Sequence, residues 1–193
     1  STMLSATDYR LAAYLFHELA HQRLYIKNDG LFNESYASFV EETGVKAWLE
    51  YNQRQHQLLH WQQLQNAGKD FTELIAEVRA NLAGLYQSDE SNVIKREMKA
   101  EIFNSFSLSH ARLIKQKWHG KRYFAAWFED PLNNARLALY NTYQGSHCAF
   151  QGLLDKAEGD LREFHHLAEQ KSRLKKDERE LWLKQKCVSL GTI

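Results

Sequence analysis

Apolar residues recur at helical spacing along nearly the whole chain, and no run of useful length alternates with the two-residue period of a β-strand. The clearest helical period lies between residues 70 and 86, where the apolar positions are Leu74, Ile75, Val78, Leu82 and Leu85. The pattern therefore predicts a mainly α fold, built as an array of many helices.

Capping residues and turn signals set the expected boundaries of these helices. Asn33 is expected to cap the second helix, and Gly44 is a candidate interruption within it. Residues 66–68, Asn-Ala-Gly, are expected to end that helix, and Asp70-x-x-Glu73 to open the next. Pro131 ends a short aromatic segment. The expected helices cover residues 5–27, 33–65, 70–86, 92–118, 133–143 and 148–156, and two more begin near residues 160 and 177.

The first of these helices contains a motif typical of metal chemistry. His17, Glu18 and His21 form the pattern H-E-x-x-H. Residues four apart lie on one face of a helix, so both imidazoles can point at one ion. Glu18 is then held beside the ion without binding it, as a general base would be in a zinc metallopeptidase.

A catalytic zinc site needs a third protein ligand, with water in the fourth position. Glu34 is the candidate, because Asn33 places it in the first turn of the second helix. A short loop would fold that helix back against the first and bring Glu34 to the two histidines. The fold expected from the sequence is thus an H-E-x-x-H helix packed against a second helix that carries the third ligand.

Histidines at helical spacing are more often surface or packed residues than ligands, and the chain contains its own control. His56 and His60 are also four apart, but Gln57 rather than Glu follows the first of them. We expect that pair to lie on a solvated or partly packed helix face. His17 and His21 differ because leucine, alanine and phenylalanine flank them, which predicts that they border a core, where polar groups need partners.

Three segments carry a resemblance to known enzymes. H-E-L-A-H-Q and N-E-x-x-A-S-x-V-E resemble the gluzincin metallopeptidases, including the aminopeptidase N type, in which the Glu of N-E is the third zinc ligand. With a late W-F-x-x-P-L-N-N-A-R-L segment, most of the chain resembles a bacterial family of predicted aminopeptidases. The resemblance implies zinc-dependent hydrolysis of peptide bonds. One departure is the connection between His21 and Glu34, which at twelve residues is shorter than in aminopeptidase N.

Further site residues are expected around the metal. A tetrahedral oxyanion needs a second donor besides the ion, and Tyr143 is the leading candidate, with Tyr140 and Arg136 as alternatives. The competing interpretation is that the Asn pair before Arg136 only caps a helix and that the tyrosines are core. Glu41 lies seven residues after Glu34, on the same helix face, and could accept the free ring N–H of a zinc-binding histidine.

The composition of the chain does not point to a nucleic-acid or membrane partner. The net charge of +1 does not suggest binding to nucleic acid or to an anionic membrane surface, and no run of apolar residues is long enough for a transmembrane helix. A length of 193 residues fits one domain over residues 1–193. Cys148 and Cys187 could pair in an oxidising compartment.

The chain starts almost directly at the metal helix, which leaves few residues for a wall opposite the metal. We therefore expect a C-terminal fragment of a longer precursor. The family that it resembles has longer members with a lipoprotein-type export signal, which implies the periplasm or cell envelope.

Two other functions fit the same residues. One is a non-catalytic helical module in which the metal is a structural staple held by four protein ligands. The other is a helical binding protein in which the histidine pair holds no metal. The leading hypothesis is a zinc-dependent peptidase that acts on a peptide substrate, with Glu18 as general base.

Overall fold

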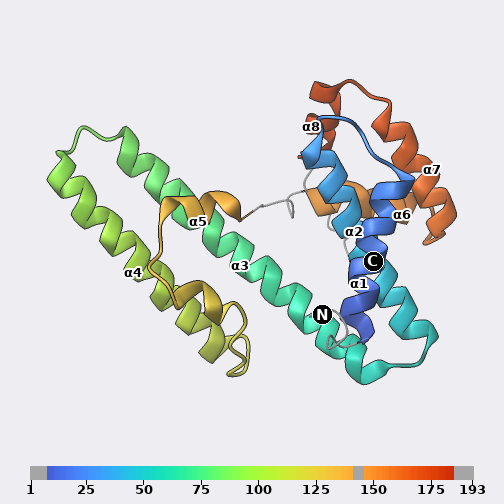
Figure 1. Cartoon of the computed structure of the whole chain (residues 1–193), viewed down its shortest axis with the longest axis horizontal. Coiled ribbons are helices and arrows are strands. Elements are labelled where there is room, and N and C mark those ends of the chain that lie inside the picture. The colour runs from blue at the N-terminus through green and yellow to red at the C-terminus, as the bar shows by residue number, and fades with distance from the viewer. Residues whose placement is uncertain (1–7, 141–145, 185–193) are drawn as a thin grey trace, which may run out of the picture. The chain divides into compact units, whose positions relative to one another are not determined.

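The computed structural model describes residues 8–140 and 146–184, and within these ranges the chain contains helices and no strand. The predicted mainly α fold is confirmed for these ranges. The helices, shown in Figure 1, are α1 (Asp8–Arg23), α2 (Gly30–Tyr51), α3 (Gln55–Gln87), α4 (Asn92–Gln116), the short 3-10 helix η1 (Ala125–Phe128), α5 (Asn134–Leu139), α6 (His147–Lys156), α7 (Leu161–Ser172) and α8 (Lys176–Leu183). None of them is both long and apolar enough to cross a membrane.

The chain forms two compact units. Unit 1 contains residues 1–61 and 143–193, and unit 2 contains residues 62–142. Helix α3 begins in unit 1 and continues through unit 2. That residues 1–193 act as one metallopeptidase domain stays a prediction.

The core of unit 1 is aromatic and lies where α2, α6, α7 and α8 meet (Figure 1). Its fully buried rings include Phe32, Tyr36, Phe39, Phe150 and Phe164. These rings pack in stacked, tilted and edge-to-face pairs, with centroids 5.2–6.4 Å apart. The core holds one face of α2 firmly and leaves another face for α1.

Helix α1 packs against α2 through small residues, which lets the two helices approach closely. Ala13 and Ala20 of α1 are buried, and a Cβ atom added to Gly44 of α2 would lie only 2.9 Å from Cγ of Phe16. The expected interruption at Gly44 is wrong, because α2 is continuous from Gly30 to Tyr51. This glycine serves close packing rather than a break.

The start of α2 differs from the sequence prediction. The cap is Asp29, whose carboxylate accepts a hydrogen bond from the backbone N–H of Phe32. Asn33 lies inside the helix, is buried, and reaches back to the preceding loop. Its side-chain oxygen accepts from the N–H of Ile26, and its side-chain nitrogen donates to the C=O of Ile26. This loop also explains why α1 ends at Arg23 rather than near residue 27.

A buried ion pair joins this cap to the last helix. Both Nε and Nη2 of Arg179 donate to Oδ2 of Asp29, at 2.9 and 2.6 Å. The side chains are 8% and 2% exposed, and Nη1 of Arg179 also donates to the backbone C=O groups of Ser172 and Leu174. Helix α8 is thereby fastened to the residue that starts α2.

The expected break at residues 66–68 is wrong, because α3 runs through them without interruption. Ala67 is fully buried, and the hydroxyl of Thr72 donates to the C=O of Gly68. The chain turns earlier, between α2 and α3, where Gln53 adopts a left-handed conformation (φ 56°). Asp70 therefore lies inside α3, where it accepts a hydrogen bond from Nε1 of Trp118 instead of capping a helix.

Several other boundaries follow the prediction. Ser91 caps α4 by accepting from the N–H of Ile94, and Asp160 caps α7 by accepting from the N–H groups of Arg162 and Glu163. Helix α8 begins one residue before the expected Asp177, where the carboxylate of Glu178 accepts from the N–H of Lys175.

Unit 2 consists of an antiparallel pair, α3 and α4, with η1 and α5 lying along it (Figure 1). The five apolar residues predicted to line one face of residues 70–86 are all buried. Phe71 is at the centre of this core and stacks on Phe124, with ring centroids 4.4 Å apart. The aromatic segment before Pro131 thus packs against the core that α3 and α4 form.

Candidate metal centre

Helices α1 and α2 bring the three predicted ligand residues together. The Nε2 atoms of His17 and His21 lie 3.2 Å apart. The two carboxylate oxygens of Glu34 lie 3.5 Å from these nitrogens, one from each. Among the described residues these three form the one group of His, Cys, Asp or Glu that could hold a metal ion.

The spacing of these atoms fits one small ion. Ligand atoms at about 2.1 Å from a tetrahedral zinc ion are about 3.4 Å from one another. The two imidazole nitrogens are 3.2 Å apart, and each lies 3.5 Å from one of the two oxygens of Glu34, so the separations are of this order. Two imidazoles and one carboxylate are also the donor set of a well-known class of catalytic zinc sites. His17, His21 and Glu34 could therefore hold a metal together.

The other ring nitrogen of each histidine has a different environment. Nδ1 of His17 lies 3.1 Å from Oε2 of Glu41. Glu41 raises the pKa of His17 through this hydrogen bond, against the lowering effect of burial, and the charges of Glu41, Glu34 and Glu18 add to the rise. Nδ1 of His21 is buried and has no hydrogen-bond partner in the described part of the chain.

The surroundings of His17 and His21 agree only in part with the sequence prediction. His17 and His21 are half-buried, but the leucines that flank them, Leu11, Leu15 and Leu19, are 39%, 49% and 55% exposed. The histidines border a core on one side only, where Ala20 is buried in the core of unit 1 and Leu24 packs against it. Glu18 is also exposed. His17 and His21 thus lie between the face of α1 that buries its alanines and the face that exposes its leucines.

The predicted oxyanion donors are not described at this site. Tyr143 lies outside the described residues. Tyr140 and Arg136 lie in unit 2, where Tyr140 contacts the hydroxyl of Thr72 at 3.2 Å. Nη2 of Arg136 donates to the C=O of Ala126. These contacts give both residues a packing role, and a role at the metal stays a prediction.

The same motif contains the two consecutive asparagines. Asn133 caps α5 by accepting from the N–H of Arg136, as the competing interpretation holds. Asn134 instead exchanges side-chain hydrogen bonds with the hydroxyl of Tyr86. Arg136 also lies over the ring of Trp127, 5.3 Å from its centroid.

The control pair behaves as predicted. His56 is exposed, and Nδ1 of His60 is bonded to the hydroxyl of Tyr9 at 3.0 Å. Helical spacing of two histidines therefore does not by itself gather ligands in this chain. His17 and His21 differ from this pair because Glu34 of the neighbouring helix α2 lies close to both of them.

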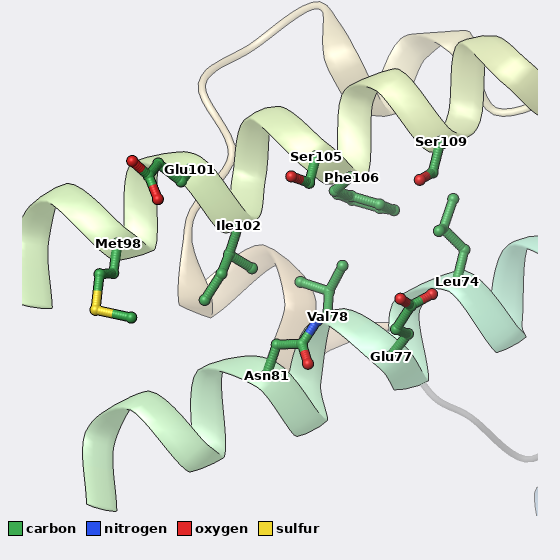
Figure 2. Close-up of a pocket in the computed structure, with 10 residues that line it drawn as sticks. All are labelled: Leu74, Glu77, Val78, Asn81, Met98, Glu101, Ile102, Ser105, Phe106 and Ser109. Carbon is green, nitrogen blue, oxygen red and sulfur yellow. The ribbon is translucent and has the colours of Figure 1, made fainter. Parts of the chain in front are cut away.

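A hollow of about 220 Å³ lies between α3 and α4 (Figure 2). Val78, Ile102 and Phe106 are among its apolar residues, and Glu77 and Glu101 are its carboxylates. Its lining, as far as the structure describes it, contains no His or Cys. The hollow lacks the donor set that the α1–α2 group provides, so that group remains the candidate site.

Sequence reasoning missed the residue that anchors this site from a distance. Arg179 holds Asp29, and Asp29 caps the helix that carries Glu34. Residues 171–179 are highly charged, which is typical of a solvated helix face, yet Arg179 is only 7% exposed. No local pattern in the sequence distinguishes this arginine from its exposed neighbours.

Comparison with known proteins identifies the family. No curated protein and no solved structure matches the chain. One family model, described as "Putative aminopeptidase", matches residues 1–183. Because this match covers nearly the whole sequence, the chain belongs to that family.

Proposed function

We propose that this protein is a zinc-dependent peptidase of the gluzincin type, with aminopeptidase activity, and that His17, His21 and Glu34 bind the zinc. The observation that carries the proposal is the convergence of two imidazole nitrogens, 3.2 Å apart, and one carboxylate with an oxygen 3.5 Å from each of them. The family description and the neighbouring Glu18 support it. The described residues offer three ligands, which suits a catalytic site with one open position better than a closed structural site.

Zinc bound there would lower the pKa of a water molecule to about 7 and polarise the carbonyl of a peptide. Glu18 accepts the proton of the attacking water and transfers it to the leaving amine. Glu41 holds His17 in the tautomer whose Nε2 faces the ion. Tyr143 is the proposed donor to the oxyanion, with Tyr140 and Arg136 as alternatives.

The decisive variant is Glu18→Gln, which keeps the shape of the side chain and removes its basicity. We expect at least a hundredfold loss of peptide hydrolysis, with zinc still bound at one equivalent. Glu50→Gln, on an exposed position of α2, is the matched control and should hydrolyse like the wild type. Full turnover by Glu18→Gln would refute the assigned role, and a wild-type protein that binds no zinc would refute the metal site.

The proposal also includes a location in the periplasm or cell envelope, which rests on the family resemblance alone. Cell fractionation of the native host with an antibody against the chain tests it. Recovery with the cytoplasmic fraction would contradict this part and would leave the chemistry untouched.

A further inference from the structure

Helix α1 carries a row of large apolar side chains that nothing in the described structure covers. Leu11, Tyr14 and Leu15 are 39%, 47% and 49% exposed. Leu19 and Tyr25 extend the apolar surface and are 55% and 66% exposed. A helix face that is exposed in a monomeric protein is ordinarily polar, so this row indicates contact with another molecule.

The row lies on the face that carries Glu18. Residues 11, 14, 15 and 18 are separated by three, four and seven positions, which places them side by side on one helix surface. On the other side of the metal group, the ring of Tyr25 meets that of His21 edge-on, with centroids 6.4 Å apart. The apolar residues therefore flank the proposed general base and one ligand.

From this juxtaposition we infer that Leu11, Tyr14 and Leu15 form the subsite for a large apolar side chain of the peptide substrate. The inference rests on the proposed function. A water molecule deprotonated by Glu18 lies within hydrogen-bond distance of its carboxylate, and the carbonyl under attack lies beside that water. The residues that adjoin the scissile bond then lie over the neighbouring turns of α1.

The surface defines a substrate class. Leucine, phenylalanine or methionine beside the scissile bond would be removed from water against the apolar row, whereas glycine would gain nothing from it. An aspartate or glutamate at the same position would be desolvated close to the carboxylate of Glu18. The enzyme should therefore prefer large apolar residues at the cleaved bond.

A binding measurement tests this separately from catalysis. Glycine hydroxamate and leucine hydroxamate bind zinc through the same two oxygens and differ in one isobutyl side chain. Titration calorimetry on the zinc-loaded chain should show that leucine hydroxamate binds about tenfold tighter or more. The double variant Leu11→Ser/Leu15→Ser should reduce that ratio to about two, with unchanged affinity for glycine hydroxamate.

Leu181→Ser is the matched control, because Leu181 is 74% exposed on α8 of the same unit, and it should keep the wild-type ratio. Equal binding of both hydroxamates by the wild type, or an unchanged ratio in the double variant, would overturn the subsite and leave the zinc proposal intact. Failure of both probes to bind would overturn the zinc proposal and the subsite together. If the wild-type protein is a dimer and the double variant is a monomer, the row is instead covered by a second copy of the chain, and the subsite is overturned.

Discussion

Glu41 lies 3.1 Å from Nδ1 of His17, seven residues along α2 from Glu34. An ionised carboxylate can only accept a hydrogen bond, so Nδ1 carries the proton and Nε2 keeps its lone pair. That lone pair belongs to the nitrogen that meets His21 and Glu34. One carboxylate on α2 thus faces Nε2 of both histidines, and a second is bonded to the opposite nitrogen of the His17 ring.

Replacing Glu41 by Gln should weaken zinc binding about 10- to 100-fold. A neutral amide orients the imidazole ring less strongly than a carboxylate does, and it makes Nε2 a weaker electron donor to the metal. Competition with a chromogenic chelator measures the affinity. The melting temperature of the metal-free protein should change little, because Glu41 is only half-buried. Glu50→Gln, also on α2, is the control. Unchanged zinc affinity in Glu41→Gln would contradict the positioning role.

Arg179→Met should destabilise unit 1 strongly, because it leaves the buried carboxylate of Asp29 without its partner. The expected loss is about 3–5 kcal/mol, measured by urea unfolding. Arg173→Met removes an exposed pair with Glu169 and should cost less than about 1 kcal/mol. Similar losses for the two variants would show that burial does not set the strength of the Asp29 pair.

Two glycines should respond to alanine in opposite ways. Gly44→Ala pushes a methyl group against Phe16 and should cost about 1–3 kcal/mol. Gly84→Ala has no atom within 4 Å of the added carbon and should stabilise α3 by about 0.5–1 kcal/mol. Thermal unfolding compares them. Because Phe16 precedes His17, Gly44→Ala should also weaken zinc binding, and a stable Gly44→Ala protein with normal affinity would contradict the close approach.

Acid should destabilise the protein through His165. Burial, together with the charge of Arg23, lowers the pKa of this histidine from 6.5 to about 4, and Nδ1 of its ring is hydrogen-bonded to the hydroxyl of Tyr36 at 2.7 Å. Between these two values the unfolded chain binds a proton that the native protein does not, so the free energy of unfolding falls as pH falls from 6.5 toward 4. His165→Gln should show a smaller slope in urea unfolding over this range. Identical slopes would rule His165 out as the cause.

Local patterns predicted the helices and the grouping of His17, His21 and Glu34, because both depend on residues close together in the chain. The period of residues 70–86 and the caps Ser91 and Asp160 act within one or two turns. His17, His21 and Glu34 lie within two consecutive helices, so their meeting required only one short loop.

Errors arose where tertiary packing overrode local signals. Asn33 has the side chain of a cap but bonds to the loop before the helix, and the Asn-Ala-Gly sequence at residues 66–68 stays helical with Ala67 fully buried. The leucines of α1 looked like core residues because sequence shows the amphipathic period but not which face a neighbour covers. Arg179 meets a partner that no local pattern could indicate.

The ion pair between Asp29 and Arg179 joins positions 150 residues apart. During translation, the α1–α2 hairpin leaves the ribosome while α8 has yet to be made, so the nascent polypeptide presents His17, His21 and Glu34 before their distant anchor exists. The start of α2 can therefore gain its full fastening only after α8 has been made, so a contact between distant positions sets the order in which this region becomes fixed.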